Sequence, residues 1–474
     1  MPNRNIDKKI TLYRLFLGLL LVVALNGCII GKNYQRPQVT VPGSWRIDEA
    51  DARQVANAHW WEHFEDPVLN TLIQTALHQN LDLLRAASRV DEYLARYQEG
   101  RSDLFPQISG QAAGGRQRAT KIGPVPLSPS IDPTSNNFLA NINLSWEIDL
   151  WGKIRRLTEA ARAEFLGMQE ARNAVILSLV SGVASSYVHL LSLDRQLEIS
   201  KATLQTRKDS VELFRSRFEG GLVSQVELLQ VKSEYYATLA LIPGIEASIA
   251  QQENALSVLL GQNPGPITRG KRFDELALPS IPAGLPSRVL EQRPDILQAE
   301  QQLVAANARI GAAQAHFFPA ISLTGVLGTS SAELKNLFTG PAQTWNYIGS
   351  VAGPIFNAGK IQNQVRIAKA QRQEMLFNYF IAIQNAFREV NDALMAQHQT
   401  RDQLRSQEKQ LESLKEYDAL AWLRYDNGYT DYLEVLDAQR NLFAVQLACT
   451  QTKENLLHAM ISLYKAMGGG WKNN

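Results

Sequence analysis

Few residues in this chain have the types and spacing that catalytic or metal chemistry requires. His59 and His63 stand four residues apart in HWWEHFED, a spacing that can bind zinc from one helix face. The glutamate that a zinc peptidase carries after its first histidine is missing, and no third ligand is near. The stretch GPIFNAGK, Gly353–Lys360, superficially resembles a phosphate-binding loop, but its glycines are one residue too far apart and Ile361 replaces the required serine or threonine. No Ser/His/Asp or Cys/His set stands out, so we expect no enzyme, no metal and no cofactor.

Cys28 is the residue whose surroundings indicate a covalent modification. A basic segment and a short apolar run, Leu15–Leu25, precede it, and the run is too short to span a membrane comfortably. Leu25, Gly27 and Cys28 resemble a bacterial lipobox, in which cleavage leaves an acylated N-terminal cysteine. We therefore expect a signal peptide over 1–27, lipidation at Cys28 and an acylated arm over 28–58. Ile29 favours the outer membrane as the destination; a plain secretory signal is the alternative.

The charge balance argues against a nucleic-acid-binding protein. The 474 residues hold 48 basic and 46 acidic side chains, and no basic stripe is visible. The only other cysteine, Cys449, lies in a helical pattern, so no intramolecular disulfide forms once Cys28 is acylated. We expect an exported protein that packing alone stabilises.

The chain contains two copies of one long unit. The stretch RFEGGLVSQVELLQVKS, Arg217–Ser233, has a counterpart in the second half of the chain in RYDNGYTDYLEVLDAQR, Arg424–Arg440. LFPQISG, Leu104–Gly110, likewise corresponds to FFPAISLTG, Phe317–Gly325. We expect a first repeat over 59–262, a proline-rich connector over 263–288 and a second repeat over 289–474. In each repeat a helix, two strands, a very long helix, a glycine corner and a return helix follow in this order.

The helical stretch of each repeat is far longer than an average helix of about 11–12 residues. Lys153–Glu219 and Lys360–Asp426 are equal in length, and neither contains a proline. As a helix, each of these stretches reaches about 100 Å at 1.5 Å per residue. With the return helices, we expect long helical hairpins over 153–261 and 360–467. A heptad seam predicts coiled-coil packing in the second one, and its residues are Leu376, Phe380, Ile383, Phe387, Val390 and Leu394.

The pattern of apolar and polar residues in the predicted strands indicates what surrounds them. In NFLANINLSWEIDLW, apolar and polar residues alternate all the way from Phe138 to Leu150. Such a strand, tilted near 45°, crosses about 30 Å, the thickness of a bilayer's hydrocarbon core. We expect β-hairpins over about 106–151 and about 319–358. A half-buried strand of a soluble sheet is the alternative.

Four strands per chain cannot close a barrel, and open edges in lipid leave backbone groups unpaired. Neighbouring chains must therefore complete it, and the polar inner face favours a twelve-stranded barrel of three chains over a side-chain-filled barrel of eight strands. Aromatic residues near the strand ends suit a membrane girdle, and they are Trp146, Trp151, Trp345 and Tyr347.

These features resemble a known family, the outer-membrane factors or TolC/OprM-type outer membrane efflux proteins, most closely their NodT-like lipoprotein branch. The resemblance is carried by RPDILQAEQQLVAANARIGAAQAHFFPAISLTG (Arg293–Gly325), GPIFNAGKI, the second corner, the lipobox, and the arm segments YQRP and WWEHFEDPVLNTLIQTALHQNLDL. It implies an α+β membrane protein, in which a trimeric twelve-stranded outer-membrane β-barrel is continuous with a long periplasmic α-helical barrel. It also implies a homotrimer that works with a periplasmic adaptor and an inner-membrane transporter.

The resemblance assigns roles to residues at the two corners. It implies that the corners receive the adaptor, and the candidate docking residues are Arg217, Gly221, Ser224, Arg424, Gly428 and Asp431. It implies a periplasmic gate at Leu433 and Asp437, which share one helix face because they are four residues apart. Three such carboxylates repel one another, so a cation, a raised pKa or a partner such as Arg440 should relieve them. For each role, turn chemistry or an ordinary solvated carboxylate is the simpler alternative.

We expect the passive outer-membrane exit duct of a tripartite, RND-type efflux pump that exports drugs or other small toxic compounds. One alternative is the same duct serving type I protein secretion. A periplasmic adaptor would need one helical hairpin with lipoyl-like sheets, and a soluble coiled-coil scaffold does not explain the Phe138–Leu150 alternation.

Overall fold

The computed structural model describes residues 29–42, 45, 59–124, 126–128, 130–278 and 286–469, with only the backbone of 286–288. The chain combines long helices with one four-stranded antiparallel sheet, as the sequence predicts. It divides into two compact units, which we describe separately. Unit 1 consists of Met1–Pro37, Val90–Met168 and Ala299–Tyr379, and unit 2 consists of Gln38–Arg89, Gln169–Gln298 and Phe380–Asn474. Each unit therefore contains segments from both sequence repeats.

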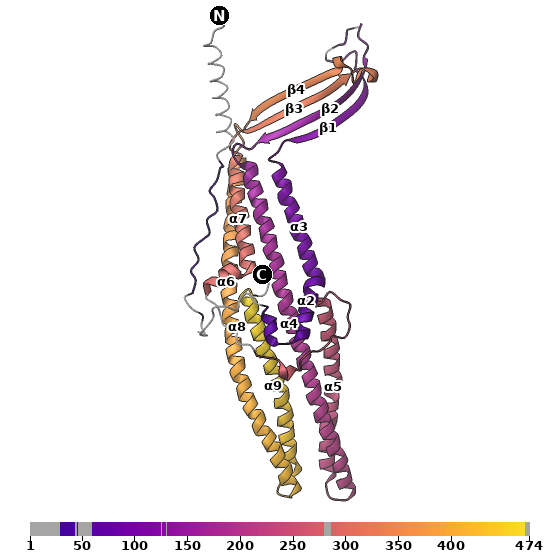
Figure 1. Cartoon of the computed structure of the whole chain (residues 1–474), viewed down its shortest axis with the longest axis vertical. Coiled ribbons are helices and arrows are strands. Elements are labelled where there is room, and N and C mark those ends of the chain that lie inside the picture. Colours follow the sequence, from indigo (N-terminus) through magenta and orange to yellow (C-terminus); the bar gives the residue numbers. More distant parts are fainter. Residues whose placement is uncertain are drawn as a thin grey trace. The chain divides into compact units, whose positions relative to one another are not determined.

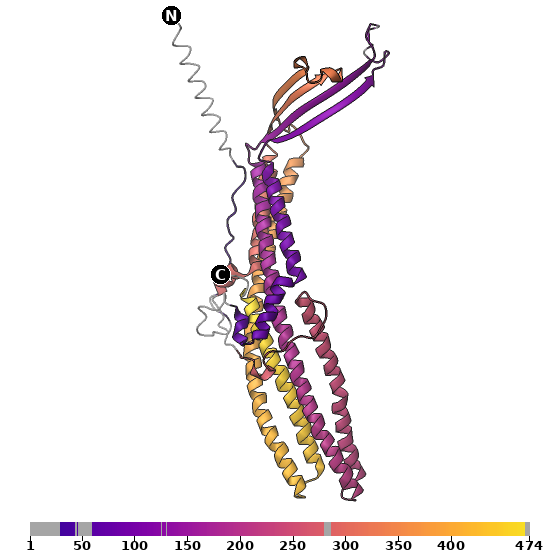
Figure 2. The same ribbon diagram turned by 45° about the vertical axis from the view of Figure 1, so that its right-hand side comes forward.

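The long helices of the two repeats match in length. The first repeat contains the short helix α2 (Pro67–Gln79), α3 (Leu81–Ser102), β1 (Gln107–Arg118), β2 (Thr134–Ile148), α4 (Lys153–Glu219) and α5 (Gln225–Leu259). The second contains α6 (Pro286–Gln292), α7 (Pro294–Ala315), β3 (Ala320–Ser331), β4 (Gln343–Ala352), α8 (Lys360–Asp426) and α9 (Tyr432–Ala466). The helices α4 and α8 have 67 residues each, and α5 and α9 have 35 each. In Figures 1 and 2, α4 lies beside α5 and α8 lies beside α9.

The sheet of unit 1 separates apolar from polar side chains. Its strands lie in the order β1-β2-β3-β4, each antiparallel to its neighbour (Figure 1). Ile142 of β2 pairs with Gly110 and with Leu327, while its neighbour Asn141 pairs with Gln111 and Gly328. Because side chains alternate along every strand, this register aligns one apolar and one polar face across the sheet. Members of the apolar face are exposed in the single chain, and they are Ile108, Ile142, Leu323, Leu327, Trp345, Tyr347 and Val351.

A side-chain cap stabilises the start of the first long helix, α4, directly after the sheet. The Asp149 carboxylate accepts hydrogen bonds from the backbone N–H groups of Ile154 (3.0 Å) and Arg155 (2.8 Å). A carboxylate at this position satisfies N–H groups that have no partner inside the helix and stabilises its positive end. The stretch GPIFNAGK that we separated from phosphate-binding loops connects β4 to α8.

Part of α4 has the length and composition of a membrane-spanning helix, but more than half of that stretch is buried inside the protein. In unit 2 the side chains of Val183, Ala184 and Tyr187 have no exposed surface. The apolar stretch is therefore core. The heptad seam of α8 is likewise directed inward, since Ile383, Val390 and Leu394 are all buried.

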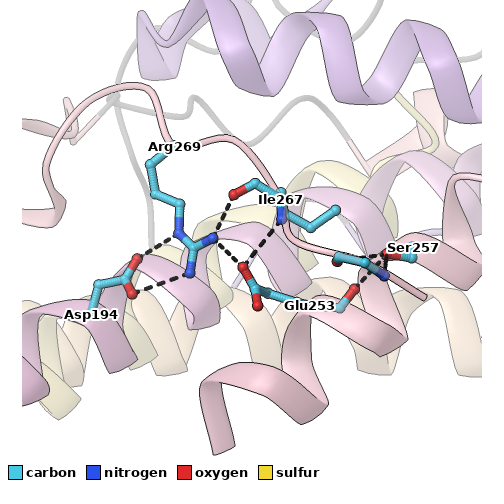
Figure 3. Close-up of polar contacts among 6 residues, drawn as sticks. Asp194, Glu253, Ser257, Ile267 and Arg269 are labelled. Carbon is cyan, nitrogen blue, oxygen red and sulfur yellow. Dashed lines mark hydrogen bonds and ion pairs between the residues drawn. The ribbon is translucent and has the colours of Figure 1, made fainter. Parts of the chain in front are cut away.

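A network of ion pairs fastens the connector to the helices of unit 2. Figure 3 shows Arg269 between the carboxylates of Asp194 on α4 and Glu253 on α5. Its Nε lies 2.8 Å from Asp194 Oδ2, and the Ile267 N–H donates to Glu253 Oε1 at 3.1 Å. Because Arg269 offers several donors in one plane, it joins two helices to the loop between repeats.

In unit 1, hydrogen bonds and an ion pair hold the described part of the N-terminal arm in an extended conformation. The Ile30 N–H donates to the Trp151 carbonyl oxygen at 3.2 Å, and Arg156 donates to the Ile30 carbonyl oxygen at 3.1 Å. Further along, Arg36 forms an ion pair with Glu300 at 2.9 Å. These contacts therefore fix the arm between Ile30 and Arg36.

Candidate functional site

The two corners are built by the same hydrogen bonds. At the end of α4 the Leu222 N–H donates to the Arg217 carbonyl oxygen at 2.8 Å, and at the end of α8 the Tyr429 N–H donates to Arg424 at 2.9 Å. Gly221 and Gly428 have a φ of 73°. This combination is the Schellman ending of a helix, in which a residue in the left-handed region reverses the chain.

Polar caps start the return helices. The Ser224 hydroxyl accepts from the Glu227 N–H at 3.2 Å, while the Glu227 carboxylate accepts from the Ser224 N–H at 2.7 Å, which forms a capping box. In the second corner the Asp431 carboxylate accepts from the Leu433 N–H at 3.0 Å. Both cap residues that the sequence singled out therefore have a structural role.

An aromatic core joins the two hairpins near the corners. Phe214 of α4 and Tyr432 of α9 are almost fully buried, with ring centroids 4.2 Å apart, and Tyr425 stacks on Phe214 at 6.0 Å. Burial raises the pKa of the Tyr432 phenol to about 12, so this ring stays neutral. The corners are thus held together mainly by packed aromatic surface.

The repeated arginines have partners inside the chain. Arg217 lies 3.4 Å from Asp426 of the other corner, and its guanidinium lies over the Tyr425 ring at 5.5 Å. Arg424 is more exposed and lies 3.5 Å from Glu434. Arg217 therefore links the corners, while Arg424 has more surface free for a partner.

A buried charge cluster lies next to the aromatic core, on the side away from the corners. Glu234 of α5 forms an ion pair with Arg207 of α4 at 3.0 Å and accepts from Arg440 Nε of α9 at 2.7 Å. Arg207 is almost fully buried and also donates to the Thr238 hydroxyl. One carboxylate therefore connects three helices, and removing it leaves a buried cation unpaired.

The structure places both candidate gate residues on one exposed face of α9. The Leu433 side chain is exposed, and so is Asp437, which accepts a hydrogen bond from Asn441 at 3.1 Å. Arg440, a candidate partner for Asp437 from the sequence, binds Glu234. The aromatic core near the corners takes other positions of α9, among them Tyr432, Val435 and Leu436.

The register places the four girdle residues at two levels of the sheet. Trp146 pairs with Leu323 and Trp345 pairs with Leu327, so the two tryptophans lie four residues apart along β3. At about 3.3 Å per residue this is about 13 Å. Trp146 is near the strand end next to the helices, whereas Trp345 is near the start of β4, the end away from α8, and stacks on Tyr347 at 5.7 Å.

Trp151 follows the end of β2, at the joint with α4. Its indole stacks on Phe318 at 4.8 Å, and its Nε1 donates to the Pro319 carbonyl oxygen at 2.7 Å. Trp151 therefore lies at the helix end of the sheet, the end nearer to Trp146.

Sequence reasoning overlooked one residue in each corner. Leu222 and Tyr429 occupy equivalent positions after the glycines, and each is 78% exposed. Both corners therefore present a large apolar side chain to solvent. The alignment of the two repeats could have revealed the pair, because both residues follow the corner glycines at equivalent positions.

Two further positions complete the survey of sequence candidates. Cys28 lies outside the described residues. His59 binds Glu62 at 3.0 Å, and in the described part of the chain no group of three or more His, Cys, Asp or Glu side chains is placed to hold a metal ion.

Comparison with known proteins identifies close relatives along nearly the whole chain. Residues 72–262 and 285–469 match the family described as outer membrane efflux protein. The cation efflux system protein CusC of Escherichia coli O6:H1 is 37% identical over 465 residues, which are 96% of this chain and 98% of CusC. The solvent efflux pump outer membrane protein SrpC of Pseudomonas putida is 36% identical over 464 residues, again 96% of this chain and 98% of the relative.

Solved structures resemble the chain as closely. A crystal structure of CusC matches with a TM-score of 0.85 and 36% identity, covering 94% of this chain and 100% of CusC. The open state of the MtrE outer membrane channel of Neisseria gonorrhoeae matches with a TM-score of 0.84 and 31% identity, covering 94% of this chain and 99% of MtrE. The likeness therefore includes both the sheet and the long helices.

Proposed function

The chain belongs to the family of outer membrane efflux proteins, and we propose that three copies of it form the passive exit duct of a tripartite efflux pump. It acts in efflux at the bacterial outer membrane and extends into the periplasm. A periplasmic adaptor and an inner-membrane transporter complete the pump. The transporter supplies the energy, and the duct catalyses no reaction.

The observation that carries this proposal is the open, two-faced sheet. β1 and β4 each pair on one side only within the described residues. Every unpaired backbone group in lipid costs several kcal/mol, so an isolated sheet of this kind is unstable in a membrane. Two further copies close it into a twelve-stranded barrel, with Ile142 and its neighbours toward lipid and Asn141 and Asn143 toward water.

The relatives favour small solutes as cargo. The name of CusC states cation efflux and that of SrpC states solvent efflux. Neither name concerns protein export, so we propose drugs or other small toxic compounds rather than a secreted protein.

The corners carry the proposed contacts with the rest of the pump. We assign adaptor docking to both of them, with Arg217, Gly221 and Ser224 in the first and Arg424, Gly428 and Asp431 in the second. Leu222 and Tyr429 support this assignment, because exposed apolar side chains at equivalent places are typical of a binding surface.

The gate is proposed at Leu433 and Asp437, since both project from one exposed face of α9. We further propose that acyl chains on Cys28 anchor the arm in the membrane and that Trp146, Trp151, Trp345 and Tyr347 contact its interface.

Single-channel recording in planar bilayers tests the duct and its gate. We expect the purified protein to insert as a trimer with a small closed-state conductance. Replacing Leu433 and Asp437 by alanine should raise that conductance several-fold, because it removes both the apolar ring and the carboxylate ring.

Val226 and Gln230 of the first repeat occupy the positions equivalent to the two gate residues. The Val226→Ala/Gln230→Ala variant is the matched control and should leave the conductance unchanged. A monomeric preparation that forms no channel contradicts the duct. A trimer whose conductance is the same in all variants contradicts only the gate.

A further inference from the structure

A cavity of about 300 Å³ lies between the two helical hairpins of unit 2. Its walls come from α4 of the first repeat and from α8 and α9 of the second. Apolar side chains line part of it, including Ile199 and Phe443, and polar side chains line the rest. Its size is at the lower end of the range of small-molecule sites.

The cavity contains a carboxylate that has no partner. Asp418 of α8 lines the cavity, and its Oδ1 atom is fully buried. Among the residues that the structure describes, no hydrogen bond or ion pair reaches this carboxylate. Burial raises the pKa of Asp418. Asp418 as a whole is half-buried, but a buried oxygen atom without a hydrogen-bond donor is costly, which points to a missing partner.

Neutral hydrogen-bond acceptors surround the same space. Thr203 of α4 and Gln439 and Gln446 of α9 line the cavity, and in the described part of the chain their side chains form no hydrogen bonds. Three hydroxyl and amide oxygens are therefore available beside the carboxylate.

The charged side chains that line the cavity from α4 are Arg195, Glu198 and Arg207, and each of them has an ion-pair partner. Arg195 lies 3.0 Å from Glu198 and 3.0 Å from Asp274. Arg207 is bound to Glu234 at 3.0 Å. The lining residues of α9 carry no charge. The negative charge of Asp418 is thus the one that the cavity walls leave uncompensated.

We propose that this cavity binds a small organic cation with a primary ammonium group. The three N–H donors of the ammonium group fit one carboxylate and two or three neutral oxygens. A short alkyl chain covers Ile199 and Phe443. A hard metal ion suits the cavity less well, because it demands six or more oxygen ligands and gains nothing from apolar walls.

A bound amine would connect the hairpins. The carboxylate belongs to α8, while its neutral neighbours belong to α4 and α9. The ligand would therefore bridge the two helical hairpins of unit 2 and stabilise the contact between them. This site is additional to the corner and gate residues, and its existence does not depend on the duct being a trimer.

Calorimetric titration of the full-length protein in detergent with n-butylammonium chloride tests the proposal. We expect saturable binding, which 1-butanol and sodium butyrate do not reproduce at equal ionic strength. Asp418→Asn should weaken binding by roughly ten- to a hundredfold, the value of a hydrogen bond to a charged group. Binding to the unaltered protein should also weaken as the pH is lowered into the acid range, as the carboxylate takes up its proton, and it should do so at a higher pH than for an ordinary aspartate.

Glu416→Gln is the matched control, because Glu416 is an exposed acid on the same helix and does not line the cavity. It should bind n-butylammonium as the unaltered protein does. Asp418→Asn keeps the side-chain shape and removes an unpaired charge, so it should fold at least as well. Gln446→Met, which removes a neutral oxygen, should weaken binding less than Asp418→Asn does. No saturable binding, or equal binding to the Asp418→Asn variant, would overturn the proposal.

Discussion

At the scale of single residues, the corners depend on a backbone conformation that glycine adopts without strain. Gly221 and Gly428 both lie in the left-handed region, with a φ of 73°. A Cβ atom added at either position meets nothing within 4 Å. Any penalty for a side chain there is therefore a backbone penalty, separate from packing.

Replacing Gly221 or Gly428 by alanine should destabilise the protein by about 1–2 kcal/mol at each site, the cost of the left-handed conformation for an L-residue. Thermal unfolding followed by circular dichroism in detergent measures this effect.

Gly244 provides the matched control, because it lies inside α5 without a positive φ and also has open space around it. Gly244→Ala should stabilise the helix by about 0.5–1 kcal/mol. Destabilisation of the same size in all three variants would mean that the corner conformation is not the cause.

At the scale of elements, a buried carboxylate fastens α9 to α4. Glu454 lies 2.8 Å from His189 of α4 and 3.4 Å from His458, one turn further along α9. Burial by itself would raise the pKa of Glu454. Hydrogen bonds from His458, Ser192 and His189 outweigh burial, so the pKa is lowered. The ionised carboxylate is therefore the form that holds the helices together.

Glu454→Gln should lower the free energy of unfolding by about 2 kcal/mol at neutral pH, since it removes hydrogen bonds to a charged group. Because the pKa of Glu454 is lowered in the folded state, its carboxylate stabilises the folded protein at pH values above the ordinary pKa of 4.5. This stabilisation is lost as the pH falls through the pKa of the folded state. The difference between the variant and the unaltered protein should therefore shrink in acid.

Urea unfolding followed by tryptophan fluorescence at a series of pH values measures this difference. Glu412→Gln, at an exposed position of α8, should change little at any pH. A Glu454→Gln effect that is independent of pH would contradict the role of its charge.

At the scale of the whole molecule, the exposed apolar face and the open edges of the sheet indicate that it is part of a larger assembly. Exposed apolar side chains of all four strands share one face, and both outer strands have open edges among the described residues. The two compact units also combine segments of both repeats. The repeats are therefore related by sequence, but they are not independent folding units.

Ile142→Arg should strongly reduce the amount of folded protein in the outer membrane, because arginine on a lipid-facing surface near mid-membrane costs about 2–4 kcal/mol. Asn141→Arg, one residue away on the polar face, should be tolerated. Fractionation of cell membranes and resistance of the sheet to added protease measure both variants. Equal losses in both would contradict the assignment of the faces.

The sequence alone determined the features that repeat at short or fixed intervals. The two glycine corners, the long helices α4 and α8 and the alternation of β2 were all visible, because side-chain direction follows the short local period of a helix or a strand. The positions of Leu433 and Asp437 on one face of α9 follow from the helical period.

Only the tertiary structure decided which faces of different helices meet. Arg440 was considered beside Asp437, yet it binds Glu234, which is 206 residues away in the chain. The aromatic contact of Phe214 with Tyr432 and the unpaired carboxylate of Asp418 were also invisible in the sequence. The physical reason is that helical periodicity tells which side chains share a face, whereas the rotation of one helix against another depends on the packing of all its neighbours.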